Sequence, residues 1–139
     1  MLTGKFFHSL DAKNRIIIPS KLKEQLGAKV TILRGSDRCL TLYSEEEWNK
    51  YEEKISELPT TKLRAIRRYI HSNAKEVQPD SQGRVMLEDD MLEFAGITRK
   101  VVTLGCGNYV EVWAEETWKE LEIDKEPENY TETLIELGL

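Results

Sequence analysis

The chain has 139 residues, of which 40% are hydrophobic and 32% are charged, a composition typical of a globular domain. No apolar run approaches the roughly 18 residues of a membrane span, and the first residues lack the apolar stretch of a secretion signal. We therefore expect a cytoplasmic protein with no membrane partner. The two cysteines, Cys39 and Cys106, form no CxxC pair, and no histidines lie at metal-ligand spacing around them, so we expect reduced thiols and no metal.

The net charge of −5 excludes a uniformly basic protein but hides a strong polarity. Residues 111–139 contain ten acidic and two basic residues, a net charge of −8. Residues 1–43 contain eight basic and three acidic residues, a net charge of +5. Charge divided in this way can leave a basic face on an acidic protein, so nucleic acid remains a possible partner.

The strongest pattern is an internal repeat, in which residues 5–50 match residues 74–119. Each copy begins with an extended segment and a four-residue turn, Asp-Ala-Lys-Asn or Asp-Ser-Gln-Gly. The aspartate at the first turn position can accept a hydrogen bond from the backbone two residues on. The fourth turn position tolerates a left-handed backbone when it is asparagine or glycine. The equivalent pairs include Asp11 and Asp80, Asn14 and Gly83, Arg15 and Arg84, Gly27 and Gly96, and Trp48 and Trp118.

A short apolar strand follows each turn, and a short helix follows the strand. In the first copy Pro19 fits the first turn of that helix, and Gly27 fits its end. Two alternating β-branched strands come next. Ser44 then fits the N-cap of an amphipathic helix that starts with three glutamates. Trp48, Tyr51 and Ile55 form its expected core-facing stripe.

The segment between the copies predicts one more helix, with an apolar line and a basic stripe on different faces. The apolar line contains Leu63, Ile66 and Ile70, and the basic stripe contains Arg64, Arg67, Arg68 and His71. Beyond about residue 124 the chain is acidic. This tail is expected either to be disordered or to dock through Tyr130, Leu134 and Leu137 as a last helix.

These patterns predict an α+β, β-rich fold with four segments. They are a first unit at 1–55, a connecting helix at 56–73, a second unit at 74–123 and an acidic tail at 124–139. One unit of about 50 residues cannot easily bury its own apolar face. We therefore expect the two units to interleave into one compact, barrel-like domain with pseudo-two-fold symmetry and flanking helices.

The segments DAKNRIIIP at 11–19 and DSQGRVML at 80–87 resemble the two DxxxR motifs of MraZ proteins, and the first 15 residues are similar to the start of that family. The resemblance covers about residues 1–120. It implies tandem swapped-hairpin units of the AbrB type in one chain, and assembly of copies into a ring. It also implies a nucleoid-associated transcription factor that binds direct repeats upstream of the cluster of genes for cell division and wall synthesis, its own gene included.

The turns supply the candidate DNA contacts. Lysine and arginine bind phosphates, arginine can bind guanine through two hydrogen bonds, and asparagine can pair with adenine. The alternative is that Asp11 and Arg15 only hold the turn as an ion pair. We expect DNA contacts from Lys13, Asn14, Arg15, Gln82 and Arg84, and a structural role in the turn for Asp11, Asp80 and Gly83.

Other basic residues are less specific. Arg64, Arg67 and Arg68 form a possible secondary basic patch, as a solvated or inter-subunit face or as phosphate contacts. Lys5, Lys21 and Lys23 are expected to be ordinary surface lysines. The sequence departs from the family where Glu88 replaces a usual proline and starts the run Glu88-Asp89-Asp90. These acids lead us to expect weaker DNA contact from the second turn than from the first.

An enzyme is not expected. Ser9 beside His8, or Cys106 between two glycines, could suggest a nucleophile. However, no GxSxG elbow and no phosphate-cradling loop is present, so we expect no cofactor and no small-molecule substrate. The alternative from another class is an AbrB-like antitoxin, which binds DNA through its hairpins and a protein toxin through the acidic tail.

Overall fold

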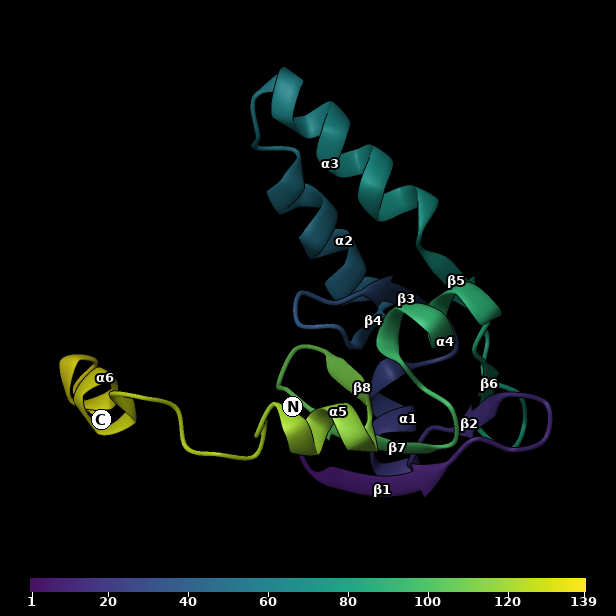
Figure 1. Cartoon of the computed structure of the whole chain (residues 1–139). Helices are drawn as coiled ribbons and strands as arrows, with labels where there is room; N and C mark the ends of the chain where they lie inside the picture. Colours follow the sequence, from purple (N-terminus) through teal and green to yellow (C-terminus); the bar gives the residue numbers. More distant parts are fainter.

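The computed structural model describes the whole chain, residues 1–139. Its centre is a six-stranded antiparallel sheet in the order β1-β7-β8-β4-β3-β5, and a separate two-stranded ribbon pairs β2 with β6 (Figure 1). The sheet strands are β1 (Lys5–Ser9), β3 (Val30–Arg34), β4 (Leu40–Ser44), β5 (Lys75–Val77), β7 (Lys100–Gly105) and β8 (Val110–Ala114). The ribbon strands are β2 (Arg15–Ile17) and β6 (Arg84–Met86).

The two repeats exchange strands, as the repeat predicts. Strand β1 of the first repeat pairs only with β7 of the second, and β5 of the second pairs only with β3 of the first. Strands β4 and β8 join the two halves at the centre of the sheet. The strand order therefore reads the same when equivalent strands of the two repeats are interchanged. This is the expected interleaved α+β fold with pseudo-two-fold symmetry.

Both repeats contribute to one apolar core. Ile16 of the ribbon is 1% exposed and its counterpart Val85 is 2% exposed, and both pack with sheet residues such as Val30 and Val101. The short helices α1 (Ser20–Leu26) and α4 (Asp89–Ala95) add Leu22 and other apolar side chains to the same core. The ribbon is therefore fixed to the sheet through its inner face, and its outer face remains free.

Helices α2 (Glu45–Ile55) and α3 (Thr60–Ser72) form a hairpin that projects from the sheet (Figure 1). Ser44 caps α2 as predicted, because its hydroxyl accepts a hydrogen bond from the backbone N–H of Glu47 at 3.2 Å. The predicted stripe on α2 reaches the core only at Ile55. Trp48 and Tyr51 instead stack on each other, half-buried, outside the core.

The C-terminal segment runs away from the body and ends in α6 (Tyr130–Glu136) (Figure 1). The tail thus forms the predicted helix, but none of its residues is buried. Helix α5 (Glu115–Glu120) precedes it and anchors Trp118 against the sheet. No helix in the structure combines the length and apolarity that crossing a membrane requires.

Candidate nucleic-acid-binding site

The ribbon places the two DxxxR turns side by side. The backbone carbonyl of Asn14 accepts a hydrogen bond from the N–H of Leu87 at 2.9 Å, and that of Gly83 accepts one from Ile18 at 2.8 Å. Each turn is therefore bonded to the chain that leaves the opposite strand. The two turns form one rigid unit, in which neither moves without the other.

The first turn is held by the carboxylate of Asp11. One oxygen, Oδ1, accepts hydrogen bonds from the backbone N–H groups of Lys13 at 2.8 Å and Arg15 at 2.9 Å. The other, Oδ2, accepts the Nε–H of Arg15 at 2.7 Å. The left-handed backbone predicted for Asn14 is present, with φ 57°.

The second turn repeats this arrangement. The Oδ1 atom of Asp80 accepts the backbone N–H groups of Gln82 and Arg84, both at 2.9 Å, and Oδ2 accepts the Nε–H of Arg84 at 2.7 Å. Gly83 is left-handed, with φ 78°. The geometry agrees with the predicted structural role of the two aspartates and Gly83.

Both aspartates remain ionised at neutral pH. The backbone N–H of Arg15 is the largest cause that lowers the pKa of Asp11, and the arginine side chain lowers it further. The backbone N–H and side chain of Arg84 lower the pKa of Asp80 in the same way. A lowered carboxyl pKa means that the turns are stabilised above the ordinary value near 4, and that this stabilisation is lost as the pH falls through the lowered pKa.

Each arginine has donors left for a ligand. Its Nε–H bonds the aspartate, and the terminal guanidinium nitrogens of Arg15 and Arg84 make no hydrogen bond within the chain. The two side chains are 26% and 28% exposed. An arginine held at Nε is fixed in direction while its outer nitrogens remain able to bind a base edge or a phosphate. The ion-pair role and a DNA role therefore coexist in one residue.

The turn tips add polar side chains to this surface. Lys13, Asn14 and Gln82 are all exposed, and none of their side chains makes a hydrogen bond within the chain. Of the five predicted DNA contacts, the ribbon brings all five to the same region. A surface of this kind offers cations, an amide pair and two oriented guanidinium groups to one ligand.

The acidic run lies beside the first turn, not the second. Lys13 and Asn14 line a shallow hollow together with Met86 and residues 87–90, which include Glu88, Asp89 and Asp90. The antiparallel pairing of β2 with β6 causes this, because it carries the end of each strand to the turn of the other repeat. The expectation that these acids weaken the second turn was therefore based on the wrong neighbour.

Lys23 of α1 lies against the second turn, which sequence reasoning missed. Its Nζ atom is 3.5 Å from the backbone carbonyl oxygen of Ser81, and its stem lies beside Gly83. It therefore supplies the positive charge that the second turn lacks in its own sequence. No local pattern could reveal this, because the two segments meet only through the exchange between repeats.

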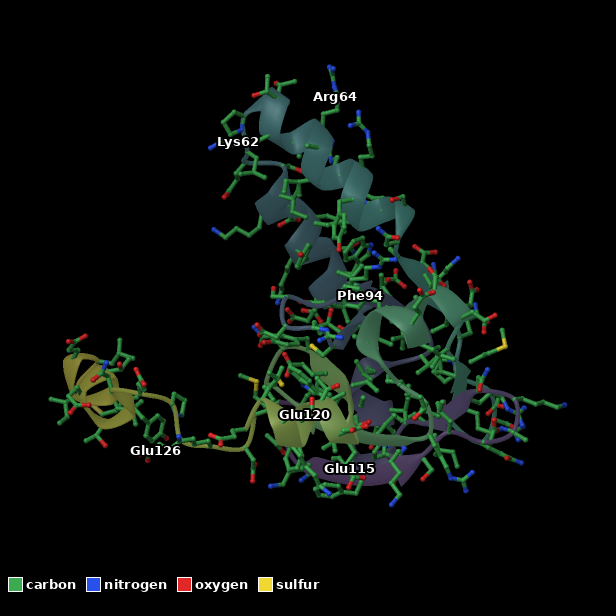
Figure 2. All side chains as sticks on the ribbon, in the orientation of Figure 1. Lys62, Arg64, Phe94, Glu115, Glu120 and Glu126 are labelled. Atoms are coloured by element: carbon green, nitrogen blue, oxygen red, sulfur yellow. The ribbon has the colours of Figure 1, made fainter.

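The basic stripe of α3 is separate from the turns. Arg64 extends from the outer end of the projecting hairpin, in Figure 2, whereas the ribbon lies at another corner of the molecule in Figure 1. Arg67 donates to the Ser56 hydroxyl at 3.2 Å, and Arg68 is exposed. The stripe holds the hairpin at one point and otherwise faces solvent, so a phosphate contact there stays a prediction.

The residues that could suggest a nucleophile are poorly placed for one. Burial is the main cause that raises the pKa of the Cys106 thiol to about 11 and that of Cys39 to about 12, so both stay protonated at neutral pH. His8 lies 2.6 Å from the hydroxyl of Thr103, and burial lowers its pKa. Ser9 pairs with Lys100 across the sheet.

Replacing Asp11 by asparagine should weaken DNA binding at neutral pH, although it removes a negative charge near phosphate. Asparagine keeps the shape of the side chain, but its amide nitrogen cannot accept the Nε–H of Arg15, so the guanidinium loses its fixed direction. We expect a loss of about tenfold, roughly one strong hydrogen bond, measured by fluorescence anisotropy.

Glu24→Gln provides the matched control for Asp11→Asn. Glu24 is exposed and lines a hollow with Asp80 and Ser81 of the second turn, but it holds no turn together. Removing its charge should leave binding unchanged or strengthen it slightly. Stronger binding by Asp11→Asn would show that charge, and not the orientation of Arg15, controls the affinity.

Comparison with known proteins agrees with this architecture. The family model described as "MraZ protein, putative antitoxin-like" matches residues 1–68 and again residues 70–136. The protein named transcriptional regulator MraZ of Clostridium tetani is 38% identical over 142 residues that cover all of both chains, and that of Clostridium acetobutylicum is 39% identical over the same span. The protein of the same name from a Thermoanaerobacter species is 42% identical, covering 86% of this chain and 85% of its own. The chain belongs to the MraZ family.

Proposed function

We propose that the chain is a DNA-binding transcriptional regulator that acts at direct repeats upstream of the cell-division and cell-wall gene cluster, including its own gene. The observation that carries this proposal is the pair of DxxxR turns held next to each other by the ribbon, each with an arginine fixed at Nε. A two-stranded ribbon fits the major groove of DNA. The relatives' name, transcriptional regulator, agrees with this use.

One copy of the site is too weakly charged to bind tightly. The surface offers four main cations, namely Lys13, Arg15, Lys23 and Arg84, and three acids lie next to the first turn. Each phosphate neutralised contributes about −0.9 to the slope of log affinity against log salt. Several linked copies on successive repeats would multiply the effect of each weak site. We therefore propose that copies assemble into a homo-oligomeric ring at the nucleoid and read the repeats together.

The charge polarity of the chain supports contact between copies. The basic half and the acidic tail attract in a head-to-tail sense, and heterologous contacts of that sense close into rings when the rotation allows. Helix α6 carries exposed apolar residues, with Tyr130 at 45% and Leu137 at 71% exposure. Light scattering at tens of micromolar should show a mass of several chains, and a monomer alone would contradict the ring.

A gel-shift experiment with the DNA upstream of the protein's own gene tests the function directly. We expect binding that survives an excess of scrambled duplex and weakens steeply between about 50 and 200 mM salt. Shortening the DNA to one repeat should lower the affinity far more than it lowers the number of sites. Equal binding to natural and scrambled duplexes would contradict a sequence-specific regulator.

An antitoxin is the second candidate, and the free C-terminal helix is the observation that favours it. Helix α6 is acidic and amphipathic, and none of its residues is buried, so it is available to a protein partner. Purification of the tagged protein from its own host distinguishes the two candidates. A small partner that elutes in equal amount and is lost when 124–139 is removed supports the antitoxin, and DNA binding without any partner supports the regulator.

A further inference from the structure

The outer face of the ribbon carries two apolar side chains among its arginines. In an antiparallel ribbon, directly opposite residues point to the same face, and successive residues alternate between faces. Arg15 is opposite Met86, and Ile17 is opposite Arg84. The middle residues of both strands are buried in the core. The outer face is therefore a square of four side chains, with an arginine and an apolar residue alternating around it.

The two apolar side chains are open to solvent to the same degree. Ile17 and Met86 are each 56% exposed, and they occupy equivalent positions, two residues after the motif arginine of each repeat. Folding does not need them, because Ile16, Ile18 and their counterparts already fill the core side. One exposed apolar residue is common on a protein surface, but a symmetric pair beside two oriented arginines suggests a ligand with apolar groups.

We propose that Ile17 and Met86 contact the C5 methyl groups of thymines in the major groove, next to the bases that Arg15 and Arg84 bind. This inference rests on the proposed function and adds the determinants of base specificity. Thymine is the natural base that presents a methyl group in that groove, and guanine presents the acceptors that suit arginine. Opposite side chains on a ribbon lie about 5 Å apart, and base pairs rise about 3.4 Å. Each arginine and its apolar neighbour therefore reach adjacent base pairs or base pairs one step further apart.

The surroundings favour DNA over a second copy of the chain on this face. The cores of protein interfaces are depleted of charged residues, whereas here two guanidinium groups flank the apolar pair. Met86 also lines one hollow together with Lys13 and Asn14, so the predicted polar contacts and the apolar contact belong to the same surface. A protein partner would have to bury the free nitrogens of both arginines without an evident acceptor, at considerable cost.

Replacement of thymine by deoxyuridine tests this contact one methyl group at a time. Each thymine of the upstream duplex is replaced singly, which removes the methyl and keeps base pairing. For the parent protein we expect about fourfold weaker binding per subunit at each methyl that is contacted, the value of one buried methyl-sized group. Ile17→Ala should lose this sensitivity at one set of thymines, and Met86→Ala at another.

Matched variants separate the contact from other effects. Ile135 on α6 is 64% exposed and lies far from the ribbon in Figure 1, so Ile135→Ala should keep the parent's response to deoxyuridine. Ile17→Met and Met86→Ile keep an apolar side chain and should keep most of the sensitivity. Circular dichroism and light scattering check that each variant folds and assembles like the parent.

Three results would overturn the inference. The first is a parent protein that binds every deoxyuridine duplex as tightly as the natural one. The second is an Ile17→Ala, Met86→Ala double variant that responds to deoxyuridine as strongly as the parent. The third is an alanine variant whose assembled mass changes while the response to deoxyuridine stays, which would assign the face to contact between copies. A parent that shows no preference for the natural duplex over a scrambled one would instead overturn the proposed function, and this inference with it.

Discussion

Replacing Arg15 by alanine should remove specific binding to the upstream repeats almost completely. The side chain is fixed by the Nε bond to Asp11 at 2.7 Å, so its outer nitrogens are oriented before DNA arrives, and alanine removes them. A lost bidentate base contact costs about 1–3 kcal/mol. In an assembly the loss recurs in every copy, so the combined effect exceeds a hundredfold. Anisotropy titrations at two salt concentrations measure it.

Arg84→Ala should also weaken binding, by a smaller factor. The first turn still has Lys13 and Asn14 where the second has Gln82 and Gly83, but the acids beside the first turn and Lys23 beside the second narrow the difference. Lys23→Ala should therefore weaken binding on all sequences alike and make the salt slope about 0.9 shallower for each site lost. If Arg15→Ala binds like the parent while folding and assembly are unchanged, the first turn is not a DNA contact.

Residues 1–58 expressed alone should not yield a folded monomer. Strand β1 has no partner without β7, β2 has none without β6, and β3 loses β5 from one edge. The core side chains of the first repeat, such as Ile16 and Leu22, would then be open to water. The expected result is an unfolded chain at low concentration, seen by circular dichroism and amide exchange.

Mixing the two parts of the chain provides the control. Residues 1–58 and 59–139 meet between α2 and α3, so the cut breaks no element. Together they should recover the strand exchange and a cooperative unfolding transition. Two copies of 1–58 could also pair at high concentration, because the repeats are equivalent. A sharply folded monomer of 1–58 would show that the repeats do not depend on each other.

The repeat in the sequence predicts the exchanged strands because two small units with the same apolar pattern bury more surface together than apart. The turn chemistry is also local, so the left-handed Asn14 and Gly83 are predictable. The family resemblance is confirmed over both repeats. The division at residues 55, 73 and 123 remains a prediction, although α2 ends at Ile55 and α3 at Ser72.

Features that depend on pairing between the repeats could not be predicted. The strand Ile16-Ile17-Ile18 is apolar throughout, so its sequence hides the alternation that leaves Ile17 exposed between two buried neighbours. The positions of Lys23 and of the acidic run follow from the antiparallel ribbon, whose register no local pattern specifies. The α2 stripe reaches the core only at Ile55 because the helical hairpin leaves the sheet.

Methyl NMR of the assembled protein with the upstream duplex tests most directly where DNA binds. Isoleucine and methionine methyl groups report on the ribbon through Ile17 and Met86, on the basic hairpin through Ile66, and on the tail through Ile135, all of them exposed. If the DxxxR turns are the DNA-binding surface, the duplex will shift the Ile17 and Met86 signals strongly and leave those of Ile66 and Ile135 in place. Strong shifts at Ile66 with unchanged signals at Ile17 and Met86 would assign DNA to α3 and contradict the account.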